Sequence, residues 1–153
     1  MTDSPGLDVT FTVSGEEDPV DLDRVRSFLQ WASSRIDLRG ELGIWLCTDD
    51  EIADLHVRYI SVDGPTDVIT FPASDPPDSE GYAGDIAVSV DTAARQAADV
   101  GHTTEREIAF LCLHGLLHLA GLDDQDDESR RTMLERQEEL IVEFERICPG
   151  DWI

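Results

Sequence analysis

The segment from 104 to 124 constrains this chain more than any other, and its centre is the sequence His-Gly-Leu-Leu-His that begins at His114. His114 and His118 are four residues apart, so a helix places both imidazoles on one face. Thr104 followed by Glu107 has the pattern of a capping box, which predicts where this helix begins. The residues around the histidines are mostly apolar, which predicts a buried helix: Ile108, Ala109, Leu111, Cys112, Leu116, Leu117 and Leu119.

A glycine turn and two carboxylates follow the histidines. Gly121 suits the left-handed position that ends a helix, and Asp123 and Asp124 come two and three residues after it. Zincin-type sites have this spacing, in the pattern H-E-x-x-H-x-x-G-x-x-H. Asp124 stands at the third-ligand position, and Gly115 stands where such enzymes carry their general-base glutamate. We therefore expect three protein ligands around one ion with a fourth position for water, the layout of a catalytic zinc. An ordinary hydrogen-bonded pair of core histidines is the alternative.

Three stretches in the same order resemble the YbeY family of proteins. Residues 114–124 resemble its signature H-G-x-L-H-L-x-G-Y-D-H, and residues 55–71 resemble L-N-x-x-Y-R-x-x-D-x-P-T-D-V-L-S-F. Residues 84–89 resemble G-D-I-x-I-S. YbeY-type proteins are single-domain, zinc-dependent endoribonucleases of 16S rRNA 3′ end maturation and ribosome quality control. The resemblance implies the same activity for this chain, with one Zn²⁺ that activates a bound water. It also implies that the partners are rRNA and components of the small ribosomal subunit, and that the location is cytoplasmic.

This chain departs from the family pattern at two positions. Asp124 replaces the family's third histidine, so the metal ligands that the resemblance implies are His114, His118 and Asp124. Ile60 stands where the family has an arginine linked to RNA cleavage, and Arg58 lies two residues earlier. The two candidates for further catalytic roles are Arg58, as a phosphate contact, and Asp123, as a group that orients a ligating histidine. Their structural alternatives are a surface salt bridge for Arg58 and a turn residue for Asp123.

Periodicity predicts a single α/β (α+β) domain over residues 1–153, with 1–6 and 149–153 frayed. Alternating or continuous apolar runs predict four strands, and amphipathic patterns with caps predict about five helices. The family implies one small mixed sheet packed with these helices. The expected strands are 7–13, 42–47, 68–71 and 85–90, and the expected helices follow Asp21, Thr48, Asp91, Thr104 and Asp127. The longest apolar runs fall short of a membrane span, and residues 1–6 lack the pattern of a signal peptide. Three widely spaced cysteines fit a reducing compartment and core positions.

Charge is the unusual property of this chain. It has 34 acidic residues against 11 basic ones, all of them arginine, and a formal net charge of −23. Such a surface repels RNA phosphates, which Lys and Arg ordinarily contact. Either the acidic surface is adapted to a salty cytoplasm, where screening hides it from RNA, or the substrate is not RNA. Two further functions therefore remain open: a metallohydrolase of another class, such as a peptidase, and a non-enzymatic ribosome-associated factor with a structural metal. The sequence does not give the oligomeric state.

Overall fold

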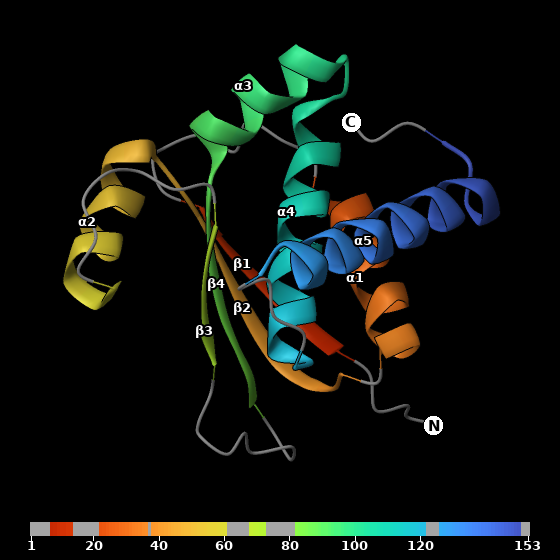
Figure 1. The fold of residues 1–153 in the computed structure, drawn as a ribbon, viewed down its shortest axis with the longest axis horizontal. Helices are drawn as coiled ribbons and strands as arrows, with labels where there is room; N and C mark the ends of the chain where they lie inside the picture. The colour runs from red at the N-terminus through yellow and green to blue at the C-terminus, as the bar shows by residue number, and fades with distance from the viewer. Residues whose placement is uncertain are drawn as a thin grey trace.

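The predicted order of strands and helices is confirmed by a computed structural model, which describes residues 7–13, 22–36, 38–60, 68–72, 82–121 and 126–150 (Figure 1). Within 56–60, 71–72 and 82–83 it describes the backbone alone. The strands are β1 (Leu7–Val13), β2 (Gly40–Cys47), β3 (Val68–Pro72) and β4 (Tyr82–Ser89). The helices are α1 (Asp23–Ile36), α2 (Asp49–Ile60), α3 (Val90–Val100), α4 (Thr104–Leu119) and α5 (Asp127–Ile147).

The four strands form one mixed sheet in the order β1-β2-β4-β3. β1, β2 and β4 are parallel, and β3 pairs antiparallel with β4 at the edge of the sheet. The parallel pairs need crossover connections, and α1 makes the one between β1 and β2. In the register, Gly43 lies opposite Asp85, Ile44 opposite Ile86 and Trp45 opposite Ala87, so residues of like parity share a face.

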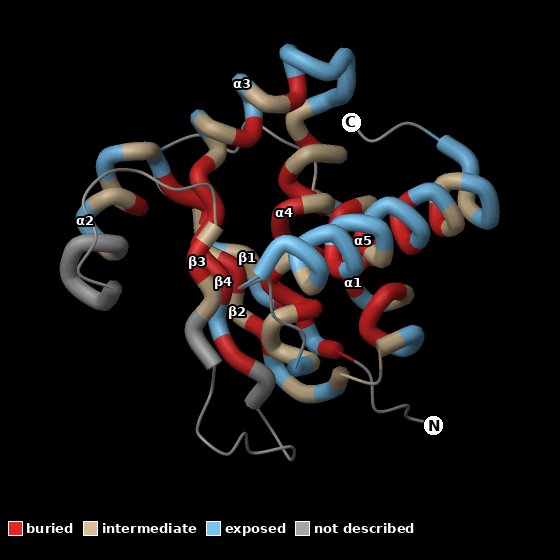
Figure 2. Tube along the Cα trace, viewed as in Figure 1, coloured by how far each residue is buried: buried red, intermediate tan, exposed pale blue. Residues whose placement is uncertain are grey.

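The helices cover the two faces of the sheet unequally. α1, α4 and α5 lie on one face, α2 lies on the other, and α3 crosses one end (Figure 1). The larger core cluster joins Leu42, Ile44 and Ile86 to the buried side of α4. The smaller cluster joins Ile52 of α2 to Cys47, Ile69 and Ala87, with Trp45 and Leu55 packed against it. Burial follows this division, with α4 buried along most of its length and α5 buried along one stripe (Figure 2).

Three predicted helix starts were wrong by one or two residues. The helix expected to follow Asp127 is α5, which begins at Asp127 with Asp126 as its N-cap. The N-cap of α4 is Thr103, whose hydroxyl accepts from the Arg106 amide, so Thr104 is the first helical residue and makes no capping box. The N-cap of α3 is Ser89 instead of Asp91, and Val90, expected at the end of a strand, opens this helix. At the start of each helix a second small polar residue lies one or two positions after the cap. The conformation of the preceding turn decides which of the two residues caps the helix.

The predicted cap of α2 is confirmed. The Glu51 amide donates to the Thr48 hydroxyl at 3.1 Å, and the Thr48 amide donates back to Glu51 Oε1 at 2.9 Å. Next to it, Asp49 ties this helix to α3: the Thr92 hydroxyl donates to its carboxylate at 2.7 Å, and the Ser89 hydroxyl donates to the same oxygen. Hydrogen bonds to the ionised form hold the pKa of Asp49 below its ordinary value, so the link is strongest with the carboxylate charged.

No helix among the described residues is both long and apolar enough to cross a membrane. The chain leaves α5 at Ile147, next to the Cys-Pro-Gly stop that was expected, and 149–150 have no regular structure. Residues 1–6 and 151–153, the rest of the ends expected to fray, lie outside the described residues. Asp21, expected to cap α1, lies outside them as well.

Candidate metal centre

Helix α4 holds the two predicted histidines between the sheet and α5 (Figure 1). Its apolar residues are buried as expected except Leu119, which is half-buried like Phe110, and Gly115 rests on Ile86 of β4. A Cβ built on Gly115 would lie 2.7 Å from Ile86 Cδ1 and 3.0 Å from Cγ1, closer than side chains tolerate. Glycine at this position therefore lets the helix approach the sheet. For the same reason, a zincin glutamate at this position would require Ile86 to shift.

The two histidine rings converge, as the four-residue spacing predicted. Their Nε2 atoms are 3.1 Å apart, their ring centres are 4.6 Å apart, and the ring planes are nearly perpendicular at 86°. Both side chains are half-buried. Zinc–nitrogen bonds of about 2.0–2.1 Å in a tetrahedral site place two ligand nitrogens roughly 3.3 Å apart. The pair is therefore close to the geometry that a divalent ion requires of two imidazole ligands.

Gln137 of α5 fixes the orientation of the first histidine. Its side chain is 1% exposed, and its Oε1 lies 3.0 Å from His114 Nδ1. Its Nε2 donates to the Phe110 carbonyl at 3.3 Å, so the amide oxygen is the atom that faces the ring. Nδ1 of His114 therefore carries the proton and donates it to Gln137. This tautomer leaves the lone pair on His114 Nε2, the atom that faces His118.

Gln137 was not predicted from the sequence. A signal was present, because Gln137 lies on the apolar stripe of α5 with Met133, Leu140, Ile141 and Phe144, where a polar side chain is out of pattern. A buried amide needs a partner. The partner lies 23 residues away in the sequence, which local patterns do not reveal.

The structure does not describe the side chains of the other predicted site residues. Asp123 and Asp124 belong to the segment 122–125, which follows Gly121 and precedes the N-cap of α5. Gly121 has the expected positive φ, at 108°. Arg58 is placed only by its backbone, on α2, across the sheet from α4. Within the described ranges, no three His, Cys, Asp or Glu side chains come together as a metal site. The third ligand and both catalytic candidates therefore remain predictions.

The two buried cysteines, Cys112 and Cys47, do not add a ligand, and Cys47 lies in the core cluster of α2 on the other face of the sheet. Cys112 lies two residues before His114 but is fully buried, and burial raises the pKa of its thiol. Cys47 is buried against β4, and burial raises the pKa of that thiol to about 12. Neutral thiols bind metals poorly, because the thiolate is the ligand. Both match the core role expected of them, whereas Cys148 is half-buried.

Comparison with known proteins gives one consistent result. The family model described as endoribonuclease YbeY matches residues 15–145. A protein of Pediococcus pentosaceus named endoribonuclease YbeY is 35% identical over 145 residues, covering 86% of this chain and 93% of its own. A protein of the same name from Gloeobacter violaceus is 42% identical over 137 residues, covering 82% of this chain and 69% of its own. The solution structure of TM1509 from Thermotoga maritima has a TM-score of 0.63 at 25% identity, over 94% of this chain and 93% of that one.

Proposed function

The chain belongs to the YbeY endoribonuclease family, and from this premise we propose that it is a zinc-dependent hydrolase that cleaves single-stranded RNA. We further propose that it acts in the cytoplasm on rRNA of the small ribosomal subunit, in 16S rRNA 3′ end maturation and quality control. The observation that carries the proposal is the pair of imidazole Nε2 atoms 3.1 Å apart, one of them oriented by a buried amide.

In this proposal His114, His118 and Asp124 hold the ion. A bound zinc ion supplies Lewis acidity and lowers the pKa of a bound water. Gln137 keeps the lone pair of His114 on Nε2. Both rings project from α4, a helix that is buried along most of its length. Asp123 is proposed to orient a ligating histidine, and Arg58 to contact a phosphate. An aspartate as third ligand lowers the charge of the site, so the water is activated less than by three histidines.

Individual residues bear on the two rival functions, the peptidase and the non-enzymatic ribosome-associated factor. A peptidase of the zincin type needs a glutamate at position 115, and Ile86 occupies the space that its Cβ would need. This contact counts against the peptidase. A non-enzymatic ribosome-associated factor is favoured by Ile60, which replaces the family's arginine. That rival predicts a bound metal without hydrolysis.

The acidic surface makes salt the natural variable in a test. The chain has a net charge of −23, so electrostatic repulsion opposes its binding to RNA at low ionic strength. At about 1 M salt the Debye length falls to about 3 Å, which screens the repulsion. We therefore expect RNA cleavage to be maintained or to increase as KCl rises, the reverse of the usual behaviour of a nuclease.

The first experiment measures the metal content of the purified protein and its cleavage of a single-stranded rRNA fragment and of an unstructured peptide, each at low and high KCl. We expect about one zinc ion per chain, RNA cleavage that a chelator removes and zinc restores, and no peptide cleavage. Peptide cleavage alone would support the peptidase. Stoichiometric zinc with neither activity would support the non-enzymatic factor.

Replacement of Gln137 by leucine is expected to weaken zinc binding about 10- to 100-fold, the usual effect of losing a hydrogen-bond partner of a ligating histidine. Leucine leaves His114 Nδ1 without the oxygen to which it donates, so both tautomers become populated. Competition with a chromophoric chelator measures the affinity.

Gln137→Glu is the comparison variant, because a carboxylate at this position still accepts from Nδ1, although it loses the hydrogen bond that Gln137 donates to the Phe110 carbonyl. Its zinc affinity should stay within a few-fold of the wild type. Equal zinc affinity in the leucine variant and the wild type would show that Gln137 does not position the ligand.

A further inference from the structure

Three arginines fasten the C-terminal half of α5 to α1 and α4. Arg106 of α4 forms a double hydrogen bond with Glu145, at 2.6 and 3.2 Å, and its side chain is only 12% exposed. On α1, Arg35 contacts the Glu143 carboxylate at 3.0 Å. Arg24, also on α1, donates to the carbonyl of the residue that caps the end of α5, at 2.6 Å. Charged hydrogen bonds of this kind, above all the paired ones, are strong, so this half of α5 is held firmly.

The same half carries three of the four buried apolar side chains of α5, those of Leu140, Ile141 and Phe144. The ring of Phe144 lies 5.1 Å from the ring of Phe28 and 5.6 Å from that of Trp31, both on α1. Apolar burial and ring packing raise the free energy needed to open a segment locally. We call residues 138–148 the anchor, and we expect the anchor to open only when the whole domain unfolds.

The N-terminal half of α5, residues 127–137, is held to the rest of the domain much more weakly. Its first turns are mostly exposed (Figure 2). Its ion pairs stay within the helix, as between Arg130 and Asp127 at 3.0 Å, and exposed pairs of this kind contribute little to stability. Two side chains of this half are buried, those of Met133 and Gln137. A helix end with so few buried contacts opens locally at a lower free energy than the anchor.

Gln137 joins this half of α5 to the candidate metal centre. Its Oε1 accepts from His114 Nδ1 at 3.0 Å, and its Nε2 donates to the Phe110 carbonyl at 3.3 Å. Opening of this half breaks both hydrogen bonds and removes the oxygen that keeps the proton on Nδ1. Asp124, the proposed third ligand, comes two residues before the N-cap Asp126, so an ion bound by Asp124 also restrains the first turn of α5. Metal binding and docking of this half on α4 are therefore coupled at both of its ends.

We propose that residues 127–137 are a latch, which closes on α4 when the metal centre is loaded and opens more often when it is empty. The anchor stays in place and is the fixed end about which the latch moves. This inference rests on the proposed ligands His114, His118 and Asp124. An ion that binds the closed latch more tightly than the open one shifts the population toward the closed state, and closure strengthens binding by the same factor. The open latch gives zinc a path to two half-buried rings, so its opening sets the rates of metal uptake and release.

The test is hydrogen–deuterium exchange of the full chain in high KCl, either with EDTA or with zinc at about a hundred times its Kd, read by mass spectrometry of peptides. With EDTA, we expect the latch to exchange at least about tenfold faster than the anchor. A ligand that binds only the closed state lowers the open fraction about 100-fold at this excess, so zinc should slow exchange in the latch by at least about tenfold. The first turns of α2, across the sheet, are the internal control and should change less than about twofold. Equal exchange in the two halves without metal, or a latch that zinc does not slow, would overturn the proposal.

Variants test whether opening of the latch controls metal release, which is measured by mixing the zinc-loaded chain with an excess of chromophoric chelator. Met133→Ala removes a latch side chain that is 1% exposed, so the latch opens more often and zinc should leave about tenfold faster. Leu134→Ala is the matched control, since Leu134 is the next residue but is 45% exposed, and it should release zinc as the wild type does. Leu140→Ala deletes an equally buried side chain from the anchor, which should lower the stability to urea without changing the release rate. Faster release from both buried variants, or from neither, would refute the latch.

The outcomes separate the latch from the proposed function. Stoichiometric zinc that leaves exchange in the latch unchanged would refute the latch and leave the metal centre standing. Closure of the latch by zinc in a chain that cleaves no RNA would refute the proposed ribonuclease activity and support the latch. A folded chain that takes up no zinc would refute both.

Discussion

Replacement of His118 by alanine is expected to remove stoichiometric zinc and to lower RNA cleavage by at least 100-fold. A 100-fold loss corresponds to about 2.7 kcal/mol in the activation barrier. The imidazole of His118 brings its Nε2 to 3.1 Å from that of His114, and no other described His, Cys, Asp or Glu side chain comes together with this pair as a third ligand. Alanine leaves the helix intact, because the position is half-buried and alanine is a strong helix former.

The measurements are zinc content by atomic emission and the rate of RNA cleavage at saturating zinc, with unfolding by urea to show that the variant is folded. His102→Ala is the matched control. His102 precedes the same helix, is exposed, and contacts Arg106 at 3.1 Å, so its loss should change neither zinc content nor rate. A folded His118→Ala chain with full zinc and full activity would rule out the proposed centre.

Most of the fold follows from local patterns in the sequence. The alternation of Leu7, Val9, Phe11 and Val13 is found as β1, and the Thr48–Glu51 box begins α2 as expected. Local patterns were ambiguous where two capping residues are neighbours, as at Thr103 and Thr104. A threonine followed three residues later by a glutamate satisfies the pattern, yet only the turn after α3 decides which hydroxyl faces the first free amides.

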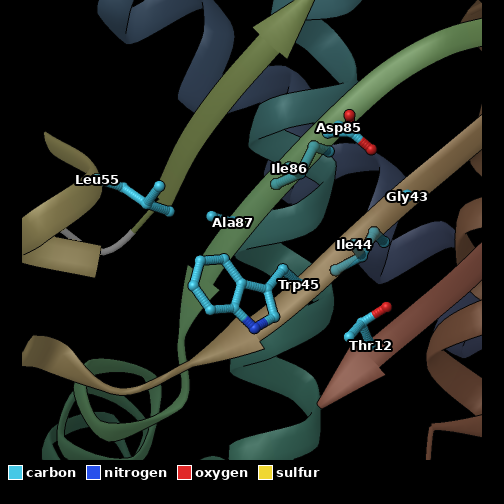
Figure 3. A pocket seen from close by; sticks show the side chains of 8 residues that line it. All are labelled: Thr12, Gly43, Ile44, Trp45, Leu55, Asp85, Ile86 and Ala87. Carbon is cyan, nitrogen blue, oxygen red and sulfur yellow. The ribbon is translucent and has the colours of Figure 1, made fainter. Parts of the chain in front are cut away.

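The sites are less accessible to sequence reasoning, because they depend on contacts between distant segments. The histidine pair was predicted because a helix fixes the relation of residues four apart. Gln137 and Ile86 were not, since each contacts α4 from another element. A hollow on the face of the sheet opposite the histidines (Figure 3) also depends on register, which brings Gly43 opposite Asp85 and Trp45 opposite Ala87. Nothing in either strand alone specifies that pairing.

Gly115→Glu is expected to destabilise the protein by about 3 kcal/mol or more, and not to create a peptidase, although it completes the sequence H-E-x-x-H. The Cβ alone would lie 2.7, 3.0 and 3.2 Å from three carbons of Ile86, a residue that is 1% exposed and stiff about its first torsion. Overpacking of this kind costs typically 1–3 kcal/mol, and burial of a carboxylate without a partner adds to it. Urea unfolding and a peptide cleavage assay measure the two parts of the prediction.

A double-mutant cycle isolates the contact from the general preference of helices for alanine. In the wild-type background, Gly115→Ala should destabilise by about 1–2 kcal/mol, although alanine in a helix interior is favoured over glycine by about 1 kcal/mol. In an Ile86→Ala background the clashing carbons are absent, so the same substitution should be neutral or stabilising. The coupling between the two positions then exceeds about 1 kcal/mol, well above what independent sites show. If Gly115→Ala stabilised the wild type, the close packing of α4 on β4 would not be the reason for glycine between the two histidines.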